Sequence, residues 1–438
     1  MEDATGLRIP VKTARRCGVP LTCLVALVLL TAGCPKVRPG AYQLGVQAYY
    51  KALLSETTEE SLRAAIASLN RHLEKNPADA GMLALRASGH LDLLRLSVQR
   101  PGGAWNTAYA AELFRDLRLL EALTDQQPAP PWLRPRLHTM AGDAFLLCAE
   151  SLRGGGDGRS VLLQAVRQGA LYRLAADFYQ HAWAAAQTPT AEAGAAASHL
   201  EKSNARDGYT SALAGLAKVK RILGFEAEAR DLAAQAIALL VSAGAPLPTP
   251  ETALSPRSLY AYSHALLKTQ YETVEALSRD SFRDRIAFAE AALKEDLASR
   301  ILKSPPEDVT FGDEPAAARL LSYYGALSVR AERFEVTGAG DSGREVVSLR
   351  LIPDGPYAAA GIHSFLDYVT LVSATQKARI SLQMPVPATG LELSIRTGQG
   401  QPGAQLLFLG RNSPLFAPGD AIRLLGPDDR QIGAAVAR

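Results

Sequence analysis

The chain has 438 residues, of which 47% are hydrophobic and 21% are charged, and its formal net charge at pH 7 is +3. A disordered chain would contain few apolar residues and carry a large net charge, and a disulfide framework of this length would need far more than 4 cysteines. The near balance of charges gives no basis for predicting a nucleic-acid partner. The length leaves room for two or three domains.

The N-terminus has the pattern of an export signal. Arg15 and Arg16 precede an uncharged apolar stretch of 13 residues, Gly18 to Leu30. Because a membrane-spanning helix needs about 20 apolar residues, this stretch is predicted to be the core of a cleaved signal peptide rather than a permanent anchor. The two arginines are interpreted as charge that orients the signal.

The apolar stretch ends in Leu30-Thr31-Ala32-Gly33-Cys34. This segment resembles the lipobox of bacterial lipoproteins, although Thr31 stands where the family usually has leucine. The resemblance implies cleavage between Gly33 and Cys34, removal of residues 1–33, and a tether over residues 34–40 that carries acyl chains such as palmitate on Cys34. The alternative is an ordinary secretory signal with an accidental cysteine.

The residue after the acylated cysteine bears on location. In diderm bacteria, lipoproteins with aspartate at this position tend to stay at the inner membrane, and this chain has Pro35 there. The resemblance therefore implies a lipid anchor in the inner leaflet of the outer membrane, facing the periplasm. Since Cys17 and Cys23 leave with the signal, Cys148 has no partner for an internal disulfide, and its apolar neighbours predict a buried, inert thiol.

Residues 41–330 are rich in helix-forming residues and are punctuated by proline and glycine. In the segment that follows Thr58, apolar residues recur at helical spacing and Pro77 ends the pattern. A proline-dense stretch at 244–256 is a possible boundary between two helical lobes. Further helices are predicted at 78–98, 104–124, 132–153, 160–187, 191–203, 207–223, 226–243, 255–303 (as two helices) and 314–330.

The stretch from Thr210 to Leu240 resembles a tetratricopeptide repeat. The resemblance assigns Leu213, Leu216 and Ala217 to the first helix, Gly224 to the turn, and Ala229 and Ala236 to close-packed positions of the second helix. It implies a TPR-like α-solenoid whose first helices form a concave protein-binding surface. A helical bundle without repeats is the alternative. Tyrosines at adjacent or near-adjacent positions are interpreted as partly buried, with exposure at an interface as the second reading: Tyr42, Tyr49, Tyr50, Tyr260, Tyr262, Tyr323 and Tyr324.

Residues 334–438 change period. Short segments that often alternate apolar and polar residues, such as EVVSLRLIP and LELSIRTG, are separated by turn-forming residues. Six to eight such strands predict a small all-β domain, either a sandwich or a barrel. The fold class expected for the whole chain is mainly α, with a helical array followed by this domain.

Motifs of catalysis and metal binding are missing from the sequence. The seven histidines have no zinc-ligand spacing, and the glycine run from Gly154 to Ser160 lacks the lysine of a phosphate-binding loop. We interpret that run as a flexible turn. Three carboxylates of one predicted helix, Glu290, Glu295 and Asp296, lie among basic residues and are interpreted as solvated ion pairs. No catalytic residue, metal or cofactor is predicted.

The expected function is a protein-binding scaffold or assembly factor, held at a membrane by its lipid, that contacts one or more envelope proteins. The alternative is a solute-binding or transport-associated lipoprotein with a small-molecule pocket between its helices. A deep apolar pocket would favour the second function, whereas an open protein-binding surface would favour the first.

Overall fold

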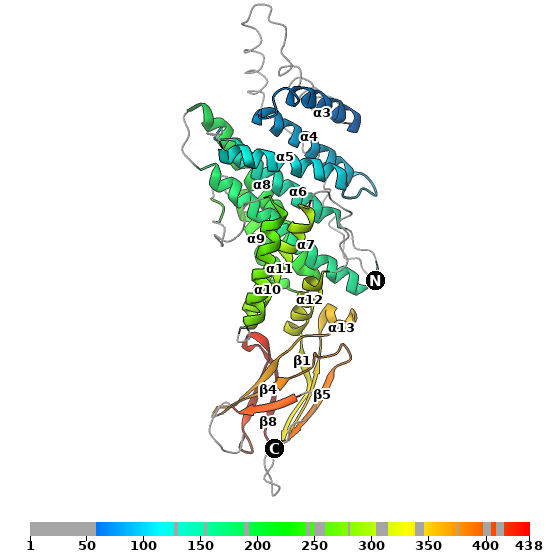
Figure 1. Cartoon of the computed structure of the whole chain (residues 1–438). Helices are drawn as coiled ribbons and strands as arrows, with labels where there is room; N and C mark the ends of the chain where they lie inside the picture. The colour runs from blue at the N-terminus through cyan, green and yellow to red at the C-terminus, as the bar shows by residue number, and fades with distance from the viewer. Residues whose placement is uncertain are drawn as a thin grey trace, which may run out of the picture.

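A computed structural model describes residues 58–126, 130–152, 156–187, 192–241, 246–248, 259–278, 281–303, 314–337, 346–374, 376–396, 404–408 and 416–438, without the side chains of 192–198 and 406–408. The predicted signal peptide, Gly33, Cys34 and the tether at 34–40 lie outside these ranges, as does most of the predicted linker at 244–256. Figure 1 shows a stack of helices that leads into a domain of strands.

The structure confirms the predicted fold class, a mainly helical array followed by a small all-β domain. Two of the predicted helices, 191–203 and 207–223, form the single continuous helix α8. The helices of the array are α3 (Glu59–Leu73), α4 (Ala80–Gln99), α5 (Thr107–Gln126), α6 (Leu133–Ser151), α7 (Gly158–Ala185), α8 (Glu192–Ile222), α9 (Glu226–Val241), α10 (Ala261–Leu277), α11 (Phe282–Ile301) and α12 (Pro315–Leu327).

Helix α3 begins at a side-chain cap. The hydroxyl of Thr58 accepts a hydrogen bond from the Ser61 amide, and the Ser61 hydroxyl accepts one from the Thr58 amide, so two orphan donors of the first turn are satisfied. The apolar stripe predicted for this helix is buried in full: Leu62, Ala65, Ile66, Leu69 and Leu73.

The helices stack as successive pairs. Helix α4 packs on α5, α6 on α7 and α8 on α9, while α4 also contacts α6, and α6 contacts α8. A further pair in this series would pack on α8. The pair formed by α10 and α11 packs on α7 through α11 instead, so it does not extend the series. Helix α12 packs on α7 and α11. The array is thus a repeat-like stack closed at one end by α10–α12.

The first helices of the stack are enclosed. Along its whole length α4 exposes only Gln99, and α6 exposes only Arg134 and Glu150. The reason is that α4 has α3, α5 and α6 as neighbours, and α6 has α4, α5, α7 and α8. The prediction that the first helices form an exposed concave surface is therefore wrong for α4 and α6. The exposed helix faces lie on outer helices instead.

The β domain consists of antiparallel strands in two sheets. Its strands are β1 (Arg330–Thr337), β2 (Val346–Ile352), β3 (Tyr368–Val372), β4 (Lys377–Leu382), β5 (Leu391–Arg396), β6 (Ala404–Phe408), β7 (Ala421–Leu425) and β8 (Gln431–Val436). They form two sheets, in the orders β1-β2-β5 and β6-β4-β3-β7-β8. The sheet edges meet: β1 contacts β8, and β5 contacts β6.

Register places alternate side chains in a core shared by the two sheets. Leu349 of β2 lies opposite Leu393 of β5, and Leu371 of β3 lies opposite Leu424 of β7, and all four are buried. Strand β1 begins at Arg330, which is earlier than the expected start of the domain at residue 334. Its side chains are mostly exposed and rich in charge, so it lacks the alternation that marks a half-buried strand.

The β domain reaches back into the helical array. The short helix α13 (Gly355–Ala359) follows β2, and its Tyr357 is fully buried in the core of the array. The Tyr357 hydroxyl donates a hydrogen bond of 2.7 Å to the carbonyl of Leu223, at the end of α8. This insertion ties the two parts of the chain together beside the point where α12 leads into β1, since Arg330 pairs with Ile352 and forms an ion pair with Asp354.

Candidate functional site

The residues assigned to the tetratricopeptide-like repeat lie on α8, α9 and the turn between them. Gly224 occupies the turn with a φ of +81°, a conformation that glycine adopts without strain. Ala217 is half-buried. The other four residues are buried where α8 and α9 pack into the array: Leu213, Leu216, Ala229 and Ala236.

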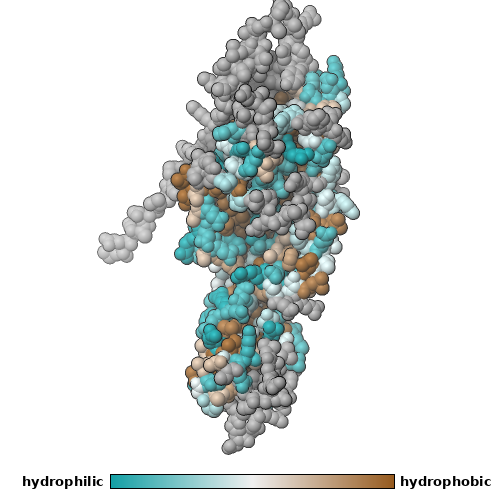
Figure 2. Space-filling view, turned by 90° about the vertical axis from the view of Figure 1, so that its left-hand side faces the viewer, coloured by the Kyte–Doolittle hydropathy of each residue, from teal (hydrophilic) through white to brown (hydrophobic). Residues whose placement is uncertain are grey.

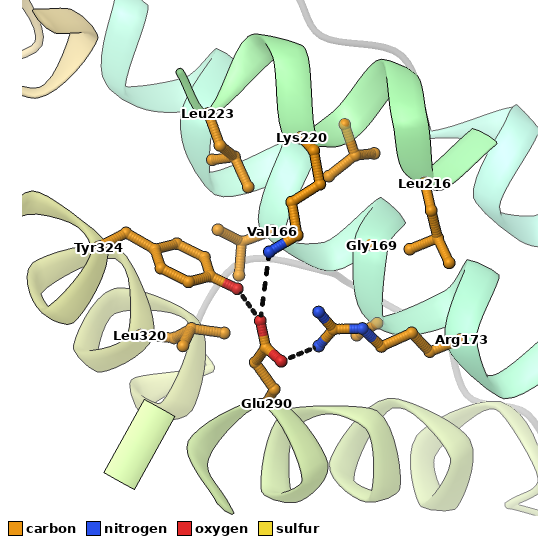
Figure 3. A pocket seen from close by; sticks show the side chains of 11 residues that line it. Val166, Gly169, Arg173, Leu216, Lys220, Leu223, Glu290, Leu320 and Tyr324 are labelled. Carbon is orange, nitrogen blue, oxygen red and sulfur yellow. Dashed lines mark hydrogen bonds and ion pairs between the residues drawn. The ribbon is translucent and has the colours of Figure 1, made fainter. Parts of the chain in front are cut away.

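A small cavity lies between α7, α8, α11 and α12, with Leu216 in its wall and Glu290 at its centre (Figure 3). Arg173 of α7 forms an ion pair with Glu290, and the Tyr324 hydroxyl of α12 donates a hydrogen bond to the same carboxylate. The ammonium of Lys220 lies 3.9 Å from Glu290 and 2.6 Å from Glu228.

Aromatic rings complete this charge cluster. The Lys220 ammonium lies 4.9 Å from the centroid of the Phe225 ring and 5.4 Å from that of Tyr324. The two rings contact each other edge to face at 5.1 Å. Such contacts add cation–π attraction to a lysine whose side chain is only 11% exposed.

The protonation states in this cluster follow from burial and pairing. Burial opposes the charge of Glu290, but the attraction of Arg173 and Lys220 outweighs it and lowers the pKa of the carboxyl below 4.5. Burial also opposes the charge of Arg173, and the pull of Glu290 outweighs it and raises the pKa of the guanidinium. Burial and the Glu290 charge raise the pKa of Tyr324. At neutral pH Glu290 and Arg173 thus form a pair of opposite charges beside the neutral phenol of Tyr324.

A second buried network follows α11. Glu295 is completely buried, with one carboxylate oxygen 2.5 Å from Nδ1 of His264 and the other 3.5 Å from the Lys294 ammonium. Lys294 also pairs with Asp177 of α7 at 2.5 Å. Nearby, Arg167 holds the buried Glu314 at 2.7 Å. Helix α11 is thus fastened to α7 and α10 by charges that are shielded from solvent.

These contacts correct the interpretation of the α11 carboxylates. Ion pairing is present, as predicted, but Glu295 is 0% exposed and Asp296 is 5% exposed, so the pairs are not solvated. Most of their partners come from other helices, with sequence separations from 28 residues for Lys268 and Asp296 to 117 residues for Arg173 and Glu290. A local sequence pattern cannot identify partners so far apart in the chain. For that reason Arg173, His264 and Tyr324 were not predicted to belong to these clusters.

The cavity beside Glu290 has a volume of about 10 Å³. A water molecule needs about that much space, whereas sites for drug-sized ligands measure about 300–1,000 Å³. The groups around it are paired with one another, and within the described residues no cluster of ligating side chains suits a metal ion. The geometry therefore fits the joining of four helices, with room for one water.

Other residues considered for chemistry lie in structural positions. Cys148 is fully buried, and burial raises the pKa of its thiol, which makes it unreactive. His90 is buried, and its pKa is lowered to about 4 by burial and by the charges of Arg86 and Arg115. In the glycine run, the side chain of Asp157 caps α7 by accepting a hydrogen bond from the Ser160 amide.

Exposed apolar side chains gather on α9 and α10. On α9, Ile237 is 61%, Leu240 64% and Val241 80% exposed. Figure 2 faces the side on which both helices lie in Figure 1, and brown patches interrupt the polar surface of the helical part. Of the paired tyrosines, Tyr323 and Tyr324 are buried, Tyr260 and Tyr262 are exposed, and Tyr42, Tyr49 and Tyr50 lie outside the described residues.

Comparison with known proteins returned no match to a protein family, a curated protein or a solved structure. Within the described ranges, no helix combines the length and hydropathy that a membrane span requires.

Proposed function

We propose that the protein is a lipoprotein that acts as a protein-binding scaffold or assembly factor of an envelope complex. Acyl chains on Cys34 hold it in the inner leaflet of the outer membrane, facing the periplasm. Its TPR-like helices bind one or more envelope proteins, and it carries out no catalysis. The observation that carries this proposal is an array whose interior charges are paired while its outer helices expose apolar side chains.

The outer face of α9 is the partner-binding surface in this proposal. Helix α9 packs chiefly on α8, and Ile237, Leu240 and Val241 at its C-terminal end are largely exposed. Contiguous exposed apolar groups cost free energy in water and mark interaction sites on soluble domains. Association with a partner would remove them from water at about 25 cal/mol per Å² of apolar surface.

A substitution in this surface tests the scaffold function. Tagged full-length protein and its Leu240→Glu variant are captured from solubilised envelopes, with Leu119→Glu on α5 as the matched control. Leu119 is also exposed, at 46%, but belongs to another helix. We expect one stoichiometric companion with the wild type and the control, and its loss with Leu240→Glu. Recovery of no companion by the wild type in repeated captures would contradict the scaffold.

The anchor is tested separately. Cys34→Ala removes the acylated thiol, and a protein held only by lipid should then move to the soluble fraction while staying folded. The measurement is membrane fractionation after a salt wash, with circular dichroism as the check on folding. A variant that still pellets with membranes contradicts the lipid anchor.

Solute binding remains the alternative function, and the described helices offer it less support. The cavity beside Glu290 holds about one water, and its charges already have partners. Native mass spectrometry of the purified protein provides the check, because a bound small molecule would favour the alternative over a scaffold.

A further inference from the structure

Helix α10 has the reverse of the polarity expected for a surface helix. Its two buried residues are His264 and Glu275, whereas Tyr262 is 78%, Leu266 49% and Leu277 76% exposed. A surface helix normally turns its apolar stripe to the core and its charges to solvent. Figure 1 places α10 at the outer edge of the helical array.

Every charged residue of α10 is engaged by the protein itself. Lys268 pairs with Asp296 at 3.1 Å, and Glu275 pairs with Arg319 at 2.7 Å. Glu272 lies 3.6 Å from the same Arg319. The nine exposed residues of the helix are all uncharged, and we call them the exposed stripe of α10: Tyr262, Ala265, Leu266, Thr269, Gln270, Thr273, Val274, Ala276 and Leu277.

Two polar members of this stripe have internal partners. The Thr269 hydroxyl donates a hydrogen bond to the carbonyl of Ala265, and the Thr273 hydroxyl donates one to the carbonyl of Thr269. With these donors satisfied within the helix, a partner can cover both threonines without leaving them unpaired.

The exposed stripe of α10 is also complementary to the same stripe of a second copy that lies antiparallel to it. If two α10 helices meet antiparallel about a two-fold axis between Thr269 and Gln270, Tyr262 lies opposite Leu277 of the second copy and Leu266 opposite its Thr273. Ala265 then lies opposite Val274. A larger side chain meets a smaller one at these positions, as helix packing requires. An interface of this kind is self-complementary, and cyclic dimers are the commonest symmetric assemblies.

We propose that the exposed stripe of α10 is a self-association surface that pairs two copies of this chain through an antiparallel α10–α10 contact. The reversed register selects the second copy, because the stripe brings no charge into the contact and its larger side chains meet smaller ones of an antiparallel copy. This inference does not depend on the scaffold function or on the lipid anchor.

The size of the contact sets its strength. A helix of 17 residues is about 25 Å long and about 10 Å across, so one helix pair covers less than the ~1,200–2,000 Å² of a stable interface. A contact of this size is typical of weak, transient association, so the dimer is expected to be weak in dilute solution. Confinement of both copies to one surface would raise their effective concentration.

Cross-linking of the full chain tests the contact. Gln270→Cys puts a thiol beside the proposed axis, and a short bis-maleimide is applied to cells that make the variant. We expect a product of twice the monomer mass. Gln431→Cys, an exposed position on β8, is the matched control that should give none. The wild type provides the background, since Cys148 is buried.

A charge in the stripe distinguishes a specific contact from collision. Leu266→Glu, added to Gln270→Cys, should lower the dimer yield about tenfold or more, because a carboxylate without a partner would be buried. Leu119→Glu, at a leucine of similar exposure, should leave the yield unchanged. Sedimentation of the same purified proteins over about 1–100 μM should rank them in the same order by the fraction of dimer.

Four cross-linking results would overturn the proposal. They are a fully labelled Gln270→Cys protein without a double-mass product, equal products from Gln270→Cys and Gln431→Cys, a yield that Leu266→Glu leaves unchanged, and a cross-linked product of another mass. The last result would assign α10 to a different protein. Binding of the Cys34→Ala protein to phospholipid vesicles, if lost with Leu266→Glu, would assign the stripe to a membrane surface and also overturn the proposal.

Discussion

Glu290 illustrates how a buried charge is retained in this protein. Its side chain is 16% exposed, and removal from water alone would favour the neutral acid. The ion pair with Arg173 reverses that preference and keeps the carboxylate charged. The group therefore stabilises the fold only while both charges are present.

We expect Glu290→Gln to lower the free energy of unfolding at pH 7 by about 1–3 kcal/mol, since it leaves Arg173, whose side chain is 30% exposed, without its counter-charge. The folded-state pKa of Glu290 lies below 4.5, so its contribution is complete above about pH 4.5 and is lost as the pH falls through the folded value. The difference between wild type and variant should therefore shrink in acid. Urea unfolding between pH 3 and pH 7 measures it.

A double variant provides the control for Glu290. Arg173→Met with Glu290→Leu removes both charges and should recover much of the lost stability, because buried ion pairs can often be replaced by apolar residues. A double variant as unstable as Glu290→Gln would contradict the assignment of the loss to an unpaired charge.

Glycines in the helices accommodate tyrosine rings. A Cβ atom at Gly208 of α8 would overlap the Tyr179 ring of α7, and one at Gly142 of α6 would lie 2.8 Å from the same ring. The Tyr179 hydroxyl donates a 2.6 Å hydrogen bond to Asp143, which fixes the ring between the helices.

We predict that Gly208→Ala destabilises the protein by about 1–3 kcal/mol, because the well-packed ring has no space to move into. Gly81→Ala in α4 is the control: its Cβ would meet the nearest atom at 3.4 Å, and alanine favours helix. Thermal unfolding should show a lower midpoint for the first variant and an equal or higher one for the second. Equal midpoints for both would contradict the overlap.

Among the helices, strands and turns, the turn between α8 and α9 is where the sequence pattern and the backbone geometry agree best. Gly224 follows the last turn of α8, and the amide of the next residue, Phe225, bonds back to the Lys220 carbonyl. This arrangement ends a helix through a left-handed residue. The two predicted strand segments around β2 and β5 also coincide with observed strands, since alternation reports a half-buried surface.

Gly224→Ala should cost about 1–2 kcal/mol, because the φ of +81° disfavours a side chain. The nearest atom to the added Cβ is Pro356 at 3.5 Å, which is ordinary contact, so the loss comes from the backbone alone. Gly224→Asn should lose less, since asparagine tolerates this conformation. Chemical denaturation of the three proteins provides the measurement, and an equal loss for both variants would contradict a backbone cause.

Prediction failed for elements whose burial is decided by distant parts of the chain. In strand β8, a glycine and two alanines lie between Ile432 and Val436, so apolar and polar residues do not alternate, and β1 is rich in charge. The stripe of α10 was not recognised because its apolar residues face solvent. The helix is positioned by Asp296 and Arg319, which lie on α11 and α12.

On the scale of the whole molecule, Arg285 joins the helical array to the β domain. Its guanidinium lies 5.2 Å from the ring of Tyr323 and 5.1 Å from that of Phe365, and it forms an ion pair with Asp367 just before β3. The side chain is 11% exposed, so the contact is shielded from solvent. Together with Tyr357, it fixes the β domain against the array.

We expect Arg285→Ala to loosen this joint by about 2 kcal/mol, from the loss of two cation–π contacts and an ion pair. Hydrogen exchange of the backbone amides around Phe365 should become faster. Arg283→Ala is the control, because Arg283 is 81% exposed and its pair with Asp428 spans 3.6 Å. Unchanged exchange in Arg285→Ala, or equal acceleration in both variants, would contradict the assigned joint.

The sequence by itself determined the mainly helical array, most helix bounds and the small β domain. These features are encoded by local periodicity, caps and turn residues that act over a few residues. The tertiary structure alone decided that α4 and α6 are enclosed, that the carboxylates of α11 are buried and paired, and that α10 shows its apolar face to solvent. Each of these depends on partners many residues away, and their positions are set by how the helices pack rather than by any local pattern.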